Sequence, residues 1–150
     1  MRDSELTRRI IGAAIAVHRE LGPGLLEAVY EECLSFELGL AGLPFSRQQP
    51  IPVVYRGTKL DCGYRADLIV CSRVIIEIKA IASLAPIHEA VMLTYLRLSG
   101  YKIGLLINFH SAVLKDGVHR FVWNYNPTEE EVERRDAEVA EKCQKRKLEC

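Results

Sequence analysis

The sequence has no long apolar run, and its first residues are polar. A membrane-spanning helix needs about 20 apolar residues in succession, and a signal peptide needs an apolar core. Residues 1–5 read MRDSE, so we expect neither a membrane span nor a signal peptide. With 150 residues, 49% hydrophobic and 27% charged, the composition is that of one globular domain with a substantial core.

Cysteine pairs are also absent. The five cysteines, at positions 33, 62, 71, 143 and 150, have no CxxC spacing and cannot all be paired within one chain. Free thiols in a reducing compartment are the better interpretation, which predicts a cytoplasmic protein. The sequence also lacks a P-loop, a GxGxxG motif, and a Ser/His/Asp or Cys/His arrangement in a recognisable context.

Neither sign of charge is in excess, because 20 basic residues balance 20 acidic ones. A protein that holds nucleic acid by charge alone is usually basic, so neutrality weakens a nucleic-acid interpretation. Neutrality does not exclude a nucleic-acid function, because a bound metal ion would offset the negative charge of the carboxylates that hold it.

Hydrophobic spacing predicts two helices before the first strand. The first has Asp3 or Ser4 as its N-cap and is broken by Gly-Pro-Gly at 22–24, and the second covers about 25–38 and is closed by Gly39. The first helix has one apolar face, formed by Leu6, Ile10, Ala14, Val17 and Leu21.

Strands and helices then follow in a mixed order. Residues 48–55 are predicted as an edge strand, because Pro50 and Pro52 each remove a ladder donor. The other predicted elements are strands at 59–70, 74–80, 101–109 and 117–123, a helix from Ala85 or Pro86 through 99, and a charged helix at 128–148. This order predicts an α/β fold with a mixed β-sheet flanked by α-helices.

The chain divides into a domain at 1–126 and a charged C-terminal helix or tail at 127–150. The tail alternates acidic and basic residues and has few apolar anchors. This pattern favours a solvated or partly frayed helix, with a partner-binding helix as the alternative.

The most informative residues are charged ones inside predicted strands. The apolar, β-branched segment 74–80 contains Glu77 and Lys79, which share a face because side chains alternate along a strand. Residues 71–73 are short enough for a hairpin turn after a strand that contains Asp67. A hairpin centred on Ser72 would pair Val70 with Val74, Leu68 with Ile76, and Asp67 with Glu77.

Two carboxylates that face each other across a ladder lie about 5 Å apart at Cβ and ordinarily destabilise the sheet. A cation between them turns that penalty into a binding site, and Lys79 lies beside whatever the cation holds. Asp67, Glu77 and Lys79 therefore have the layout of a metal-dependent site for phosphodiester cleavage.

A further carboxylate, Glu27, lies in the first turn of the second predicted helix, within the segment GLLEAVY at 24–30. A glutamate at this position complements the helix dipole and needs no function for that. The rigid Gly-Pro-Gly before it and the Asp67, Glu77 and Lys79 set make a functional role more plausible than the position alone does.

Five motifs in order resemble the GxxExxY proteins, a family of the PD-(D/E)XK nuclease superfamily. They are GxxExxY at 24–30, YRADL at 64–68, IEIKA at 76–80, a helix from HEA at 88–90 to TYLRLSG at 94–100, and GLLINF at 104–109. The resemblance covers about 10–123. IEIKA alone is a weak signal, whereas the ordered series is specific.

The resemblance implies a restriction-endonuclease-like core and a set of site residues. Asp67 and Glu77 match the acidic ligands of the superfamily, Lys79 matches its lysine, and Glu27 matches a helical glutamate that completes a carboxylate cluster for Mg²⁺ or Mn²⁺. Hard divalent cations prefer such oxygen ligands, activate water and neutralise charge on phosphate. Lys79 would orient that water or stabilise the phosphorane, with a salt bridge to Glu77 as its alternative role.

Four other side chains are candidates for substrate contact, each with an alternative. Tyr30 packs beneath the site or hydrogen-bonds a ligand, and Arg65 contacts phosphate or forms a salt bridge. His88 packs or contacts substrate, and Tyr95 lies on the same helix. Related nucleases often have glutamine four residues before this tyrosine (QxxxY), where this chain has Val91 on the face of His88 and Tyr95.

The sequence therefore favours a small metal-dependent nuclease that acts on nucleic acid, DNA rather than RNA. Val91 and the neutral charge favour the alternative, a catalytically weak or inactive descendant of the fold that binds nucleic acid or protein. A chain of this size has little room to grip a duplex, so a homodimer or a protein partner is expected.

Overall fold

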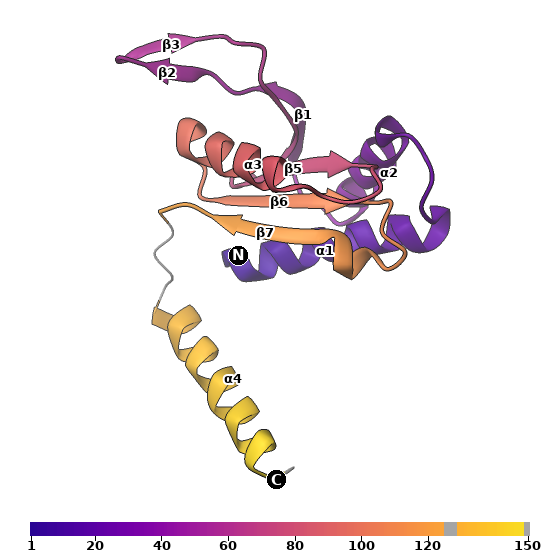
Figure 1. Ribbon diagram of the computed structural model, residues 1–150, viewed down its shortest axis with the longest axis vertical. Coiled ribbons are helices and arrows are strands. Elements are labelled where there is room, and N and C mark those ends of the chain that lie inside the picture. Colours follow the sequence, from indigo (N-terminus) through magenta and orange to yellow (C-terminus); the bar gives the residue numbers. More distant parts are fainter. Residues whose placement is uncertain (125–128, 149–150) are drawn as a thin grey trace.

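The computed structural model describes residues 1–124 and 129–148, and it contains a five-stranded mixed sheet with helices on both faces (Figure 1). The strand order is β1-β4-β5-β6-β7, with only the β5–β6 pair parallel. The five strands are β1 (Phe45–Pro50), β4 (Arg65–Val70), β5 (Val74–Lys79), β6 (Ile103–Asn108) and β7 (Val118–Val122). The predicted fold class, a mixed sheet between helices in a restriction-endonuclease-like core, is confirmed.

The helices form two layers that cover this sheet. The described elements outside the sheet are α1 (Asp3–Leu21), α2 (Glu27–Leu40), α3 (Pro86–Ser99), the short 3₁₀ helix η1 (Leu114–Gly117) and α4 (Glu129–Leu148). The α1 and α2 helices pack on one face through a core that includes Leu68 and Ile76, and α3 packs on the other through Ile69 and Ile75. Because both faces are covered, the central strands are apolar at nearly every position.

The predicted helix boundaries need small corrections. The α1 helix starts at Asp3 and is preceded by Arg2 as a cap without a side-chain hydrogen bond, so neither Asp3 nor Ser4 caps it. The α2 helix runs past Gly39 to Leu40, because the left-handed turn that leaves the helix is made by Gly42, with φ +70°. The α3 helix agrees with the prediction, and Gly100 ends it with φ +80°.

The two long strands predicted at 48–55 and 59–70 are each divided. The structure places β2 (Val53–Tyr55) and β3 (Thr58–Leu60) in a separate two-stranded sheet, the β2–β3 hairpin, which projects from the domain in Figure 1. Pro50 is the last residue of β1 and Pro52 precedes β2, and neither has an N–H to donate to a ladder. Between β3 and β4, Gly63 has φ +78° and donates its N–H to the Asp61 carboxylate at 3.0 Å, which turns the chain.

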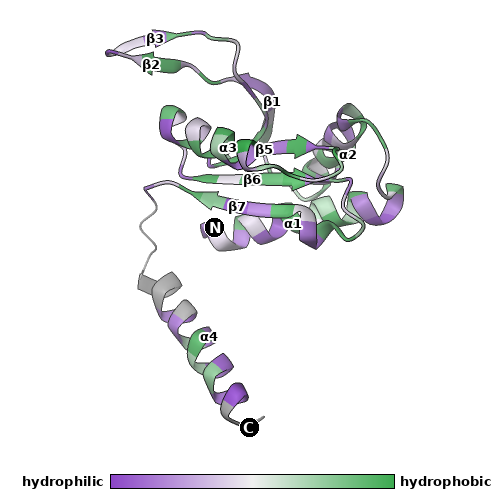
Figure 2. Ribbon diagram, in the orientation of Figure 1, coloured by the Kyte–Doolittle hydropathy of each residue, from purple (hydrophilic) through white to green (hydrophobic). Residues whose placement is uncertain are grey.

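The C-terminal helix α4 lies away from the sheet in Figure 1, and its described side chains are exposed. Figure 2 shows hydrophilic and hydrophobic residues alternating along the coloured part of this helix. Thr128, where this helix was predicted to begin, lies outside the described residues. No helix in the described part of the chain combines the length and the apolar character that crossing a bilayer requires.

Candidate active site

The antiparallel β4–β5 hairpin brings Asp67 close to Glu77. The predicted register is confirmed at Val70–Val74 and Leu68–Ile76, where the ladder ends. Asp67 and Glu77 are not a further ladder pair as predicted; instead, the Asp67 carboxylate accepts the Ile78 N–H through Oδ2 at 2.8 Å. The two acidic groups are nevertheless close enough for the charge on Asp67 to raise the pKa of Glu77.

The Glu77 carboxylate is the most perturbed group of the site. Its Oε1 atom is buried and has no hydrogen-bond partner in the part of the chain that the structure describes. Burial first, and then the charge on Asp67, raise the pKa of Glu77 to about 8, although Lys79 opposes the shift. A buried acceptor without a partner is costly, and a bound cation or a proton relieves that cost.

The pKa of Asp67 is also raised, but hydrogen bonds offset part of the shift. Burial raises its pKa, hydrogen bonds from the Ile78 N–H and the Gln48 amide lower it, and the charges of Glu31 and Glu27 raise it again. Asp67 also lines a cavity of about 310 Å³ together with Glu27, Ala28, Glu31, Gln48 and Ile78. The α2 helix and the β4–β5 hairpin therefore enclose an acidic cavity.

Within residues 1–124 and 129–148, no three His, Cys, Asp or Glu side chains are grouped closely enough to hold one metal ion. The three carboxylates predicted as ligands thus do not converge as their side chains stand. Mg²⁺ usually retains several waters and is bound by one or two carboxylates. The unpartnered Oε1 of Glu77 beside the Asp67 carboxylate fits that requirement, and Glu27 lines the cavity next to Asp67.

Lys79 lies at the end of β5, two residues after Glu77, and is half-buried. In the parallel ladder it is the partner of Asn108. It forms no ion pair within the described part of the chain, so the salt bridge to Glu77 that was its alternative role is not observed. Its ammonium still acts on the site, because its charge lowers the pKa of Glu77.

Two roles were predicted for Tyr30, packing beneath the site or a hydrogen bond to a ligand, and the structure shows the packing. Its side chain is fully buried, and its ring stacks on Phe109 with 4.5 Å between the centroids. Its hydroxyl donates to the Gly22 carbonyl at 2.7 Å and accepts the Leu25 N–H at 3.1 Å. These contacts fix the loop that leads into α2, and they leave Tyr30 no surface for the substrate contact that was predicted.

His88 and Arg65 have structural contacts of their own. His88 Nδ1 accepts the Ala85 N–H at 2.8 Å, which caps the start of α3. Arg65 is exposed, donates to the Gln48 carbonyl at 3.4 Å, and forms no ion pair within the described residues. Phosphate contact therefore remains the prediction for Arg65, and the salt bridge is not observed.

Tyr95, on α3, lies within the electrostatic influence of Glu77 and Asp67. Burial raises its pKa, and the charge on Glu77 raises it further, as do those of Tyr64 and Asp67. Its ring meets that of Tyr64 edge-on, with 5.3 Å between the centroids. Val91, one turn earlier, is 39% exposed and so is not a core residue.

Two polar residues of the site, Gln48 and Glu31, are absent from the sequence prediction. Gln48 Nε2 donates to Glu31 Oε1 at 2.5 Å and to Asp67 Oδ1 at 3.1 Å. Gln48 has φ +50°, in the left-handed region that a non-glycine residue adopts only at a cost of about 1–3 kcal/mol. It lies opposite Asp67, between the paired positions Arg47–Leu68 and Gln49–Ala66, and the pair that these two residues would form is missing from a ladder whose register is otherwise continuous.

Variants of Gln48 separate its backbone conformation from its amide. Gln48→Gly should be more stable than Gln48→Ala by about 1 kcal/mol, because glycine adopts φ +50° without strain. Both variants lose the amide donor to Asp67, so both should bind divalent cation more weakly than the wild type. Thermal melts with and without Mn²⁺ measure both effects. Equal stability of the two variants would show that the left-handed conformation of residue 48 is not retained in solution.

The raised pKa of Glu77 predicts a pH dependence of stability in the metal-free protein. The folded state holds this proton up to a pH of about 8, whereas an unfolded glutamate loses it near 4.5. The stabilising contribution is therefore complete below pH 4.5 and is lost as the pH rises through 8. Melts in chelator should show wild type falling relative to Glu77→Gln across that window. Parallel curves would contradict the buried, unpartnered position of Glu77.

A model of the PD-(D/E)XK nuclease superfamily matches residues 4–121 of the chain. The match includes the β4–β5 hairpin, Glu27 and the whole of α3, and it ends before α4. No curated protein and no solved structure gives a significant match.

Proposed function

Because the chain belongs to the PD-(D/E)XK nuclease superfamily, we propose that it is a metal-dependent nuclease that hydrolyses phosphodiester bonds in DNA. The observation that carries this proposal is the Oε1 of Glu77, which is buried and has no hydrogen-bond partner within the described residues, next to Asp67 and on the strand of Lys79. The ordered motifs further support membership of the GxxExxY proteins within the superfamily.

The proposed roles follow from the surroundings of each side chain. Asp67 and Glu77 would hold Mg²⁺ or Mn²⁺, with Glu27 at the neighbouring wall of the cavity. When bound, the ion would supply a positive charge that activates water and neutralises charge developing on the phosphate. Lys79 has no competing carboxylate partner in the described chain, so its three N–H groups are available to an attacking water or a phosphate oxygen.

An endpoint assay on defined substrates tests the proposal. Linear, circular, single-stranded and branched DNA are incubated with the protein and Mg²⁺, Mn²⁺ or chelator, with RNA of the same sequence in parallel. We expect cleavage that needs the cation and is absent from a Lys79→Ala preparation purified in the same way. Cleavage that persists in chelator would identify a contaminating nuclease and contradict the proposal, and equal cleavage by the variant would contradict the catalytic role of Lys79.

A second candidate function is a nuclease fold that has lost efficient catalysis and serves as a nucleic-acid or protein-binding module. It is favoured by the apolar, 39% exposed Val91 and by the dispersed ligand set in the described residues. The free thiols among the described cysteines suit a reducing compartment such as the cytoplasm for either function. A homodimer or a protein partner is likewise proposed for either one.

Substitution of Val91 distinguishes the two candidates. Val91→Gln should leave the fold intact, because the side chain is 39% exposed. It should raise Mn²⁺-dependent cleavage about tenfold, which corresponds to roughly 1.4 kcal/mol from one added polar contact. Val91→Leu is the matched control, because it changes the size of the side chain without adding a polar group. An intact Val91→Gln protein with unchanged activity would remove Val91 from the chemistry.

A further inference from the structure

The β2–β3 hairpin and the chain that returns from it to the sheet contribute no residue to the two buried hydrophobic clusters of the described chain. Every residue from 54 to 65 is exposed, and the hairpin stands away from the body of the domain in Figure 1. Its exposed large side chains include Val54 (46%), Tyr55 (59%), Leu60 (42%) and Tyr64 (41%). An isolated two-stranded hairpin is marginally stable in water, so a bound partner would stabilise the folded form of this segment.

The hairpin nevertheless has a defined shape. Arg56 and Gly57 at its tip have φ +50° and +76°, the pattern of the tight turns whose twist matches paired strands. At its base, the buried Ile51 donates its N–H to the Tyr64 carbonyl at 2.8 Å. The segment from Ile51 to Tyr64, here called the arm, is thus closed at both ends.

The arm and the residue after it carry an excess of positive charge in a chain with no net charge. This segment contains three basic residues, Arg56, Lys59 and Arg65, and one acidic residue. The acidic residue is Asp61, whose carboxylate accepts the Gly63 N–H. None of these three cations forms an ion pair within the described residues. The Arg56 guanidinium lies over the Tyr55 ring, 5.6 Å from its centroid, so charge and an aromatic face are presented together.

Aromatic rings connect the arm to the acidic groups. Tyr64 contacts Tyr95 edge-on, which leaves part of the Tyr64 ring exposed, and Tyr95 lies within the electrostatic influence of Glu77. Arg65 follows Tyr64 and precedes Asp67 by two residues on the same face of β4. An extended ligand that lay along the arm would therefore reach the carboxylates without leaving contact with the protein.

We propose that the arm, together with Arg65, binds single-stranded nucleic acid, with unpaired bases stacked on Tyr64 and Tyr55 and phosphates on Arg56, Lys59 and Arg65. Exposed aromatic rings favour unpaired bases, because the faces of paired bases are covered within a duplex. The consequence that the substrate has unpaired nucleotides beside the scissile bond rests on the proposed nuclease function. Binding by the arm does not require cleavage.

Fluorescence anisotropy in chelator tests the proposal without any catalytic step. The probe is a labelled single-stranded oligonucleotide of about 20 nucleotides, compared with the same sequence as a duplex. The wild type should bind the single strand more tightly. Tyr64→Ala should weaken that binding about tenfold, and Tyr64→Phe, which keeps the ring, should restore it. The double variant Arg56→Ala/Lys59→Ala should reduce the slope of log affinity against log salt by about 1.4.

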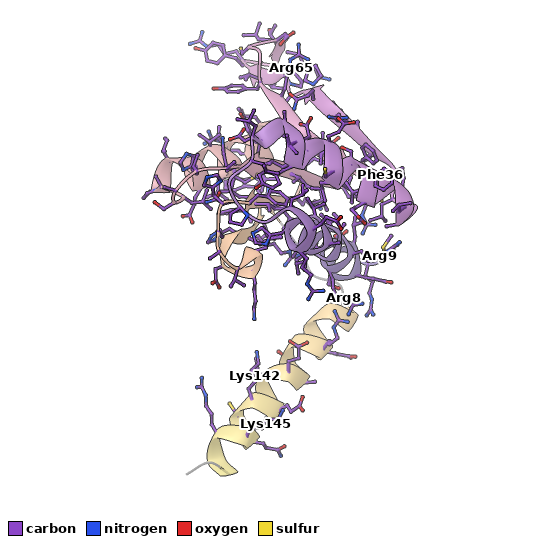
Figure 3. All side chains as sticks on the ribbon, turned by 90° about the vertical axis from the view of Figure 1, so that its right-hand side faces the viewer. Arg8, Arg9, Phe36, Arg65, Lys142 and Lys145 are labelled. Carbon is purple, nitrogen blue, oxygen red and sulfur yellow. The ribbon has the colours of Figure 1, made fainter. Side chains whose placement is uncertain are left out.

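Arg8→Ala is the matched control, because Arg8 is an exposed arginine on α1, on the opposite side of the domain from Arg65 in Figure 3. It should leave binding unchanged, and melts should show that every variant is folded. Unchanged affinity in folded Tyr64→Ala and the double variant would overturn the proposal, as would tighter binding of the duplex.

Failure of this proposal is distinguishable from failure of the proposed function. If the protein cleaves with Mg²⁺ or Mn²⁺ and the arm variants cleave all substrates as well as the wild type does, the nuclease proposal is supported and the arm proposal fails. If the arm variants lose single-strand affinity and no condition gives cleavage, the arm proposal is supported and the nuclease proposal fails.

Discussion

Lys79→Ala is expected to lower metal-dependent cleavage by about 10²–10³, the loss typical of removing one preorganised donor from a transition state. The reason is the position of the ammonium on the strand of Glu77, without an ion-pair partner in the described chain. Single-turnover rates at saturating Mn²⁺ measure the loss, and thermal melts on the same preparation measure stability and the response to the cation.

The response to the cation should survive in Lys79→Ala, because lysine is not a ligand. It should even increase slightly, since a positive charge beside the carboxylates is removed. Lys102→Ala, at an exposed lysine before β6, is the control and should be fully active. A structural role for Lys79 would produce the reverse pattern: lower stability with nearly normal activity per folded molecule.

Asp67→Asn is expected to remove most of the stabilisation that divalent cation gives the folded protein. A ligand at one hundred times its Kd contributes about 2.7 kcal/mol, which corresponds to roughly 5–10 °C in Tm for a domain of this size. Asparagine keeps an oxygen to accept the Ile78 N–H, so the substitution removes charge while the β4–β5 contact remains.

The metal-free Asp67→Asn protein should be at least as stable as the wild type at neutral pH. Asp67 itself is buried at a raised pKa, and its charge also raises the pKa of Glu77. Asp116→Asn, an exposed aspartate in η1, serves as the control and should keep the full Mn²⁺-induced shift. Equal shifts in wild type and Asp67→Asn would place the cation elsewhere.

The sequence predicted the central hairpin of the site because its information is local. A three-residue turn fixes the β4–β5 register, and the alternation of side chains then places Glu77 and Lys79 on one face. The α3 helix was predicted for a similar reason, since Pro86 near its start and Gly100 after its end mark both boundaries.

Features that depend on distant segments could not be predicted. The contacts of Gln48 with Glu31 and Asp67 join residues 17 and 19 positions apart, and Gln48 makes them with a left-handed backbone conformation, φ +50°, inside β1. A pattern of alternating residues does not reveal such a conformation. The separation of β2 and β3 from the main sheet was missed likewise, because strand propensity does not say which neighbour a strand pairs with.

Because the arm is closed at its base, the length and sequence of the segment beyond the base can change without disturbing the sheet. Pro50 and Arg65 are partners in the β1–β4 ladder, and Ile51 and Tyr64 are joined just beyond them. Changing the length of a surface segment between fixed ends costs little free energy, because closure entropy grows only with the logarithm of length. Insertions, deletions or grafted sequences between 52 and 63 should therefore leave the catalytic framework intact, so that such chains can diverge in what they recognise while the chemistry stays the same.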